Sequence, residues 1–163
     1  MDGTTVWQTA RSCPTSGGGE VAVFENKGYY WEAAVNGPKI SVIDLESGQY
    51  LYSSESLTPG LIQQVAPFVG PDGTIYGTRT MNNVSTDFLF ALNDKGSYFE
   101  EKWNVPLGYV PFGTFGVGPD GSVYSYLPTN EIIRINPENG VVIDTSEIPL
   151  GRDFAQPPMP IHD

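Results

Sequence analysis

The chain repeats VGPDGTIYG (residues 69–77) as VGPDGSVYS (residues 117–125), 48 residues further on. Six of the nine residues are identical, and two more differ conservatively. A weaker copy, FENKGYYWE, occupies residues 24–32, with Asn26-Lys27-Gly28 in the place of Pro-Asp-Gly and Trp31 in the place of Tyr76. Three copies along one chain predict a repeat architecture.

A second pattern follows each copy of the first. It occurs as ISVIDLESGQYLY (residues 40–52), FLFALNDKGSYFE (88–100) and IIRINPENGVVID (132–144). These runs are rich in β-branched and aromatic residues that partly alternate with polar ones, which indicates strands. Their glycines, Gly48, Gly96 and Gly140, are 48 and 44 residues apart and are suited to the positive φ that tight turns require.

Each period therefore predicts a four-stranded antiparallel meander, with strands near 65–69, 74–79, 88–93 and 97–103 in the middle copy. Such a sheet has two apolar faces, so the copies must stack on one another. Radial stacking of these units gives an all-β propeller. We expect one propeller segment over residues 1–163, with complete blades at about 20–55, 65–104 and 111–147 and partial strands at 3–10 and 157–163. A β-sandwich is the alternative.

These motifs resemble the quinoprotein-like (PQQ-repeat) propeller family. The resemblance rests on PDGTIY, PDGSVY, FALNDKG, RINPENG, VIDLESG and GTTVW, and it extends over nearly the whole chain. It implies an outer-strand tryptophan that docks neighbouring blades; that residue is present as Trp7 and displaced as Trp103, whereas Tyr52 and Asp144 replace it elsewhere. The family has about six to eight blades, so three blades imply a segment of a longer chain or a ring completed by a partner.

Composition excludes several classes of function. Eight basic and 19 acidic residues leave a net charge of −11, which would repel a nucleic acid. Cys13 is the single cysteine, so neither an intrachain disulfide nor a cysteine-based zinc site can form. His162 is the single histidine and lies near the chain end, so we expect neither a catalytic triad with a histidine base nor a histidine-rich metal site. No run of residues is apolar enough to span a membrane, and an export signal is not recognisable.

Four residues are candidates for binding because they follow or lie within shared motifs and carry charge or an aromatic ring: Glu32, Arg79, Tyr126 and Arg134. Arginine and aromatic residues are enriched at binding hot spots. Asn83 begins an Asn-X-Ser glycosylation sequon. By contrast, we expect Tyr76, Tyr124 and Trp31 to be buried between blades.

We expect neither a metal site nor a cofactor. The aspartates and asparagines near turn glycines lack the alternate spacing of a calcium loop and are better explained as Asx turns. In the quinoprotein dehydrogenases that the chain resembles, a vicinal disulfide helps to hold the cofactor, and one cysteine cannot form it. A pair of catalytic carboxylates would need no histidine, but the spacing of the acidic residues does not single out such a pair.

The functional prediction is a non-catalytic binding or assembly module, extracellular or periplasmic, within a larger protein or a homo-oligomer. Its partner would be a protein or a carbohydrate, because acidic loops favour basic or sugar-rich ligands. The alternative is a propeller enzyme, either a quinoprotein dehydrogenase or a hydrolase or lyase that uses loop carboxylates. A test separates the two functions: an enzyme would require Glu32, Arg79 and Tyr126 to converge on one site, whereas a binding module would leave them dispersed.

Overall fold

The computed structural model describes residues 4–10, 20–34, 37–55, 57, 67–80, 87–108, 115–127, 129 and 131–147. All regular elements in these ranges are β-strands, so the all-β prediction is confirmed. None of the described residues forms a helix that is long and apolar enough to cross a membrane.

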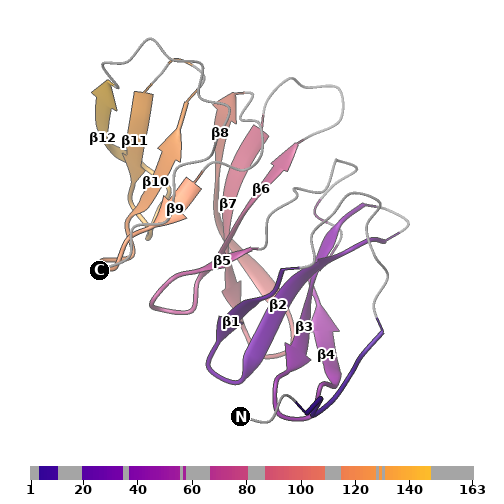
Figure 1. The fold of residues 1–163 in the computed structure, drawn as a ribbon. Coiled ribbons are helices and arrows are strands. Elements are labelled where there is room, and N and C mark those ends of the chain that lie inside the picture. Colours follow the sequence, from indigo (N-terminus) through magenta and orange to yellow (C-terminus); the bar gives the residue numbers. More distant parts are fainter. Residues whose placement is uncertain are drawn as a thin grey trace.

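The strands form three separate four-stranded antiparallel sheets, and the order in each sheet follows the sequence (Figure 1). The first sheet contains β1 (Ala22–Phe24), β2 (Lys27–Glu32), β3 (Lys39–Asp44) and β4 (Tyr50–Ser53). The second contains β5 (Phe68–Val69), β6 (Ile75–Thr80), β7 (Asp87–Asp94) and β8 (Phe99–Gly108). The third contains β9 (Phe115–Val117), β10 (Val123–Tyr126), β11 (Glu131–Ile135) and β12 (Val142–Glu147). These are propeller-type blades rather than the two packed sheets of a sandwich.

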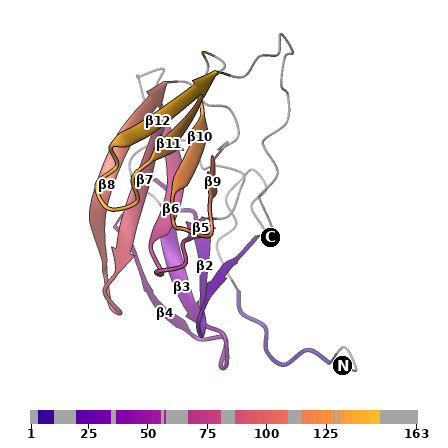
Figure 2. The same ribbon diagram turned by 90° about the vertical axis from the view of Figure 1, so that its left-hand side faces the viewer.

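The middle sheet is buried on both faces because successive residues of a strand point to opposite sides. Ile75, Phe90 and Leu92 pack against the first sheet in one apolar cluster. Tyr76, Leu89 and Ala91 pack against the third sheet in another. Successive inner strands also meet, and the rings of Phe68 and Phe115 lie 4.8 Å apart between centroids. The sheets are therefore stacked in sequence order, as Figures 1 and 2 show from two sides.

The turn glycines behave as the sequence predicts. Gly48, Gly96 and Gly140 have φ values of 70°, 86° and 72°, and Gly73 and Gly121 of the Pro-Asp-Gly turns have 82° and 78°. In both of those turns the aspartate accepts hydrogen bonds from the main-chain NH and the hydroxyl of the residue two positions later. The interpretation of such acidic residues as Asx turns is confirmed for this motif.

The alignment of the weak third copy is wrong by two residues. Phe24 pairs with Lys27, so the first turn contains only Glu25 and Asn26, and Glu25 has a φ of 52°. Gly28 lies inside β2, where a Cβ atom would come within about 3 Å of Val21 and Ile43. The counterpart of Tyr76 in this sheet is consequently Tyr29 rather than Trp31, as the strand register shows.

The expected strand at residues 3–10 does not form in the described residues 4–10. An outer strand is defined by hydrogen bonds to a neighbouring strand of its own sheet, and residues 4–10 have no such neighbour in the described part of the chain. Even so, Trp7 docks on the first sheet as an outer-strand tryptophan would, because its Nε1 donates to the carbonyl of Leu45 at 2.8 Å. The expected strand at 157–163 lies outside the described residues. β8 extends four residues beyond the expected blade end at 104.

Candidate interaction face

The three sheets share a register that identifies equivalent residues. In each sheet, the pairing between the third and fourth strands shifts near the hairpin that joins them, and in the second sheet it also shifts at the start of β7. Along the third strand, the last residue before the shift near the hairpin belongs to one pair in each sheet: Val42–Tyr52, Ala91–Trp103 and Arg134–Asp144. We call the outer-strand member of each pair, Tyr52, Trp103 or Asp144, the docking position.

Counted along the sequence, Trp103 is displaced from the place of the outer-strand tryptophan, but the strand register shows that it is not displaced in the sheet. In the sequence, Trp103 lies seven residues after Gly96, whereas Tyr52 lies four residues after Gly48. The hairpin of the second sheet is two residues longer, because Leu92 pairs with Glu101 where Ile43 pairs with Tyr50. The third residue of the difference arises because Gly96 comes one residue earlier in its turn than Gly48 does. Trp103 therefore occupies the docking position after all.

In the first two sheets, the residues on the face toward the next sheet are buried. Tyr29, Ile40 and Val42 of the first sheet are 1%, 0% and 0% exposed, and their counterparts Tyr76, Leu89 and Ala91 are fully buried. The corresponding residues of the third sheet are Tyr124, Ile132 and Arg134. Ile132 is 38% exposed and the Arg134 side chain is 41% exposed. A face that is core in two sheets is thus accessible in the third.

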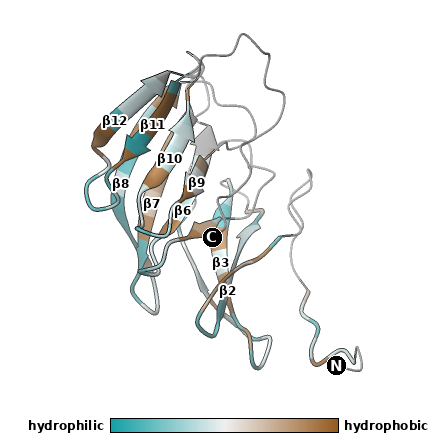
Figure 3. Ribbon diagram, turned by 60° about the vertical axis from the view of Figure 1, so that its left-hand side comes forward, coloured by the Kyte–Doolittle hydropathy of each residue, from teal (hydrophilic) through white to brown (hydrophobic). Residues whose placement is uncertain are grey.

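We define the outward face of the third sheet by the residues on this side of β10, β11 and β12: Tyr124, Tyr126, Ile132, Arg134, Asp144 and Ser146. Asp144 and Ser146 are exposed, and the two tyrosines are half-buried. Figure 2 views the molecule from this side, with the third sheet in front. The face mixes apolar and charged residues, and both brown and teal segments occur along β11 in Figure 3.

Arg134 is held on this face by the Pro-Asp-Gly turn of its own sheet. Its Nη2 donates to Asp120 at 2.8 Å, and Nε and Nη2 donate to the Ser122 hydroxyl at 3.0 and 2.9 Å. The main-chain NH and the hydroxyl of Ser122 lower the pKa of Asp120, and Arg134 lowers it further. The guanidinium is consequently fixed in place, and its positive charge is partly neutralised.

The residue at the docking position contacts the third turn of the following sheet, which connects its third and fourth strands. Trp103 Nε1 donates to the carbonyl of Pro137 at 2.8 Å, and its ring lies against Gly140. Trp7 makes the same contacts with Leu45 and Gly48. The docking function that the resemblance implies for this tryptophan is therefore performed by both Trp7 and Trp103.

Tyr52 docks in a different way, through a carboxylate. Its hydroxyl donates to Asp94, which is the register equivalent of Leu45 and Pro137. Lys27 Nζ and the Tyr29 hydroxyl also donate to Asp94, at 2.7 and 2.8 Å. Burial opposes ionisation of Asp94, but these donors and the NH of Gly96 outweigh it and lower its pKa. Burial also raises the pKa of Tyr29 and Tyr52.

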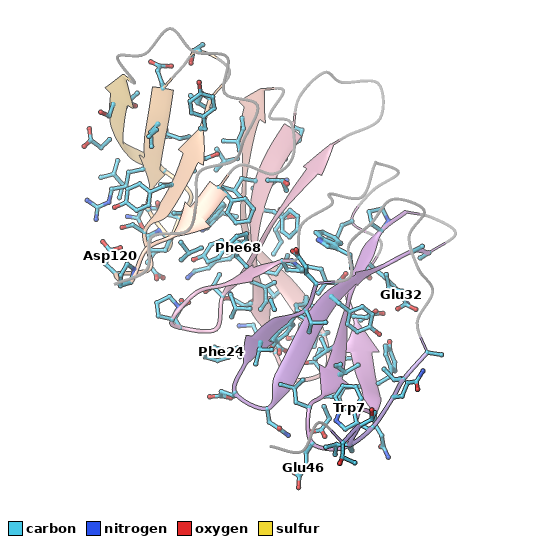
Figure 4. All side chains as sticks on the ribbon, viewed as in Figure 1. Trp7, Phe24, Glu32, Glu46, Phe68 and Asp120 are labelled. Atoms are coloured by element: carbon cyan, nitrogen blue, oxygen red, sulfur yellow. The ribbon has the colours of Figure 1, made fainter. Side chains whose placement is uncertain are left out.

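The four binding candidates from the sequence do not form one cluster. Tyr126 and Arg134 share the outward face of the third sheet. Glu32 lies on the opposite side of the first sheet, where it accepts from the Ser41 hydroxyl and pairs with Lys39 at 3.3 Å. Figure 4 shows Glu32 and Asp120, the partner of Arg134, far apart on the two outer sheets. The backbone of Arg79 pairs with Phe88 in β6, and its side chain and Asn83 lie outside the description.

Two residues that stand out in the structure were not singled out from the sequence. Asp144 is visible there only as a replacement for the family tryptophan, although an acid at a docking position is itself a signal. Asp94 was interpreted as an Asx-turn residue, and its Oδ1 does accept from Gly96 NH at 2.7 Å. Its contacts with Lys27 and Tyr29 span more than 60 residues and have no local signature. Among the described residues, no group of three acidic, cysteine or histidine side chains is placed to hold a metal ion.

Comparison with known proteins supports the fold. No family model matches the chain, and no curated protein matches it in sequence. Among solved structures, BamB from Moraxella catarrhalis is similar with a TM-score of 0.56 and 12% identity, covering 84% of this chain and 39% of BamB. Hydrazine synthase from Kuenenia stuttgartiensis is similar with a TM-score of 0.54 and 16% identity, covering 78% of this chain and 36% of that one.

The chain is thus an all-β protein of the propeller type, built from four-stranded blades that dock through their outer strands. It spans less than two fifths of the length of these two similar structures. At 12% and 16% identity the likeness concerns the fold, and it does not identify the quinoprotein-like family.

Proposed function

We propose that this chain is a non-catalytic assembly module that binds a protein partner through the outward face of its third sheet. The observation that carries the proposal is the equivalence of Ile132 and Arg134 with residues that are fully buried in the other two sheets. This face is suited to cover another sheet, because its cross-strand pairs are the equivalents of pairs that already cover a sheet at the other two faces.

The composition of the face also supports a protein partner. Tyr124, Tyr126 and Arg134 belong to the residue types enriched at binding hot spots, and Ile132 supplies apolar area beside them. Glu32 and Arg134 lie on different outer sheets and have separate partners, which favours dispersed contacts over one catalytic cluster. We propose further that the chain belongs to the quinoprotein-like family and that it is extracellular or periplasmic. Fractionation of the source cells tests the location.

The experiment is site-specific photocrosslinking in the source cells. A photoreactive amino acid replaces Ile132 on the face, and the matched control replaces Tyr98, which is 57% exposed in the turn before β8. We expect one dominant protein adduct from position 132 and none from position 98. The adduct's protein, once purified, should bind the wild-type chain, and Ile132→Asp should weaken that binding because it places a charge in the apolar part of the face. Equal crosslinking from both positions would contradict the proposal.

A further inference from the structure

Contact with a third turn follows one chemical rule at the three places where the described residues make it. Trp7 and Trp103 donate through Nε1, and Tyr52 donates through its hydroxyl. Each acceptor belongs to the third turn of the following sheet: the carbonyls of Leu45 and Pro137, and the carboxylate of Asp94. In each case the preceding sheet or segment donates and the turn accepts.

Asp144 reverses this rule. An ionised carboxylate has only acceptor atoms, so it cannot donate to a turn. Its Oδ1 accepts from the NH of its neighbour Thr145 at 2.8 Å, and the side chain is exposed. No ion pair to Asp144 is present within the described ranges, since Arg134, its strand neighbour, pairs with Asp120. A sheet that covers Asp144 would take the carboxylate out of water, so that sheet must itself bring the donor.

We propose that the outward face of the third sheet binds a further β-sheet whose third turn presents a lysine or arginine to Asp144. This inference rests on the proposed function and adds the chemistry of the partner. A cation at that turn would pair with the carboxylate and would be drawn to a chain whose net charge is −11. An apolar residue of the partner would cover Ile132, as Ile40 and Leu89 are covered at the other junctions.

A second copy of the chain does not meet this requirement. Its third turns offer the acceptors of Leu45, Asp94 and Pro137, and each already receives a donor from the preceding sheet or segment. The third turn of the second sheet does carry a cation, Lys95, but Lys95 pairs with Glu100 and the first sheet already covers that turn. Placing any of these oxygens opposite Asp144 would bring two acceptors together without a proton, which disfavours the contact. The face thus selects against the chain's own turns.

The requirement for a cation opposite Asp144 can be tested with variants designed so that one copy of the chain binds another. Trp7→Ala vacates the third turn of the first sheet. In that background, Leu45→Lys adds a cation to the turn, and separately Asp144→Trp restores an indole donor at the docking position. Leu45→Met is the uncharged control for the first change. Circular dichroism confirms folding of each variant, and the two routes are independent because Asp144→Trp leaves Leu45 unchanged.

Sedimentation equilibrium measures association of the purified full-length variants. We expect both the Leu45→Lys and the Asp144→Trp chains to associate about tenfold or more tightly than Trp7→Ala alone or its Leu45→Met form. Added salt should weaken the Leu45→Lys association and leave the Asp144→Trp association nearly unchanged. If the folded Leu45→Lys chain associates no better than Leu45→Met while Asp144→Trp associates, the cation requirement is overturned and the face remains a docking surface. If Ile132→Glu has no effect on any association, the proposed function itself is overturned.

Discussion

The junction between the first and second sheets and the junction between the second and third sheets solve the same packing problem with different chemistry. At the second junction, the indole of Trp103 lies on Gly140 and donates to a main-chain carbonyl. At the first junction, Tyr52 takes the docking position and donates to the carboxylate of Asp94. One junction is closed by a neutral ring against a glycine, and the other by a carboxylate with Lys27 and two tyrosines.

The difference shows that the docking residue and the turn that receives it vary together. A Cβ atom at Gly48 would lie 2.5 Å from the Trp7 ring, and one at Gly140 would lie 3.0 Å from the Trp103 ring. At Gly96, which faces no tryptophan, a Cβ atom would meet nothing within 4 Å. An indole thus requires a glycine beneath it, whereas a tyrosine requires only an acceptor within reach of its hydroxyl.

The largest expected effect comes from removing the indole. Trp103 is 7% exposed, and its ring lies 5.7 Å from that of Tyr76 between centroids. Trp103→Ala should lower the free energy of unfolding by about 3–5 kcal/mol, the usual range for a buried aromatic residue. Trp103→Phe, which keeps a ring but loses the NH, should cost less. Urea denaturation measures both, and a loss below about 1 kcal/mol for the alanine variant would show that the ring does not close this junction.

Asp94→Asn should break the polar junction at a smaller cost. The amide cannot neutralise the Lys27 ammonium, and only one of its two ends can accept the hydroxyl bonds. Because the Lys27 side chain is 30% exposed and can rehydrate, we expect a loss of about 2–3 kcal/mol, below the cost of breaking a fully buried pair. The matched control is Glu100→Gln, whose pair with Lys95 is exposed and should contribute little. Equal effects of the two substitutions would contradict the assignment.

Acid should weaken the polar junction and spare the neutral one. The folded pKa of Asp94 is lowered. Its stabilisation is therefore fully present above the unfolded pKa of about 4 and is lost as the pH falls through the lower folded value. The difference in unfolding free energy between wild type and Asp94→Asn should shrink between neutral pH and the lower edge of that window. The difference for Trp103→Phe should stay constant, and a parallel decrease in both would disprove the distinction.

The smallest effect separates the two turn glycines. Alanine at Gly96 or Gly140 should cost about 1 kcal/mol through the positive φ alone. Gly140→Ala should cost more, because its Cβ atom would press on the Trp103 ring. In a Trp103→Ala background this excess should vanish, so a double-mutant cycle measured by urea denaturation isolates it. If Gly140→Ala still costs more than Gly96→Ala in that background, the extra loss of stability comes from the backbone and not from the Trp103 ring.

The candidate site was partly predictable. Tyr126 and Arg134 were singled out from the sequence, and the structure places both on the outward face. Glu32 was singled out as well, and it lies on the other outer sheet. The sequence left open whether these residues converge, because the place of a residue within its repeat does not say which residues of other sheets lie near it.

The sequence by itself determined the strands, the turns and the repetition of four-stranded units. These follow from alternation of apolar residues and from glycines that adopt positive φ, and both requirements act over a few neighbouring residues. Only the tertiary structure decided that Trp103 occupies the same docking position as Tyr52, because this depends on a hairpin two residues longer. It likewise decided that Asp94 receives Lys27 and Tyr29 and that Asp144 receives no ion-pair partner in the described chain. Those outcomes depend on contacts between separate sheets, whose free energy is set by burial and geometry rather than by local conformation.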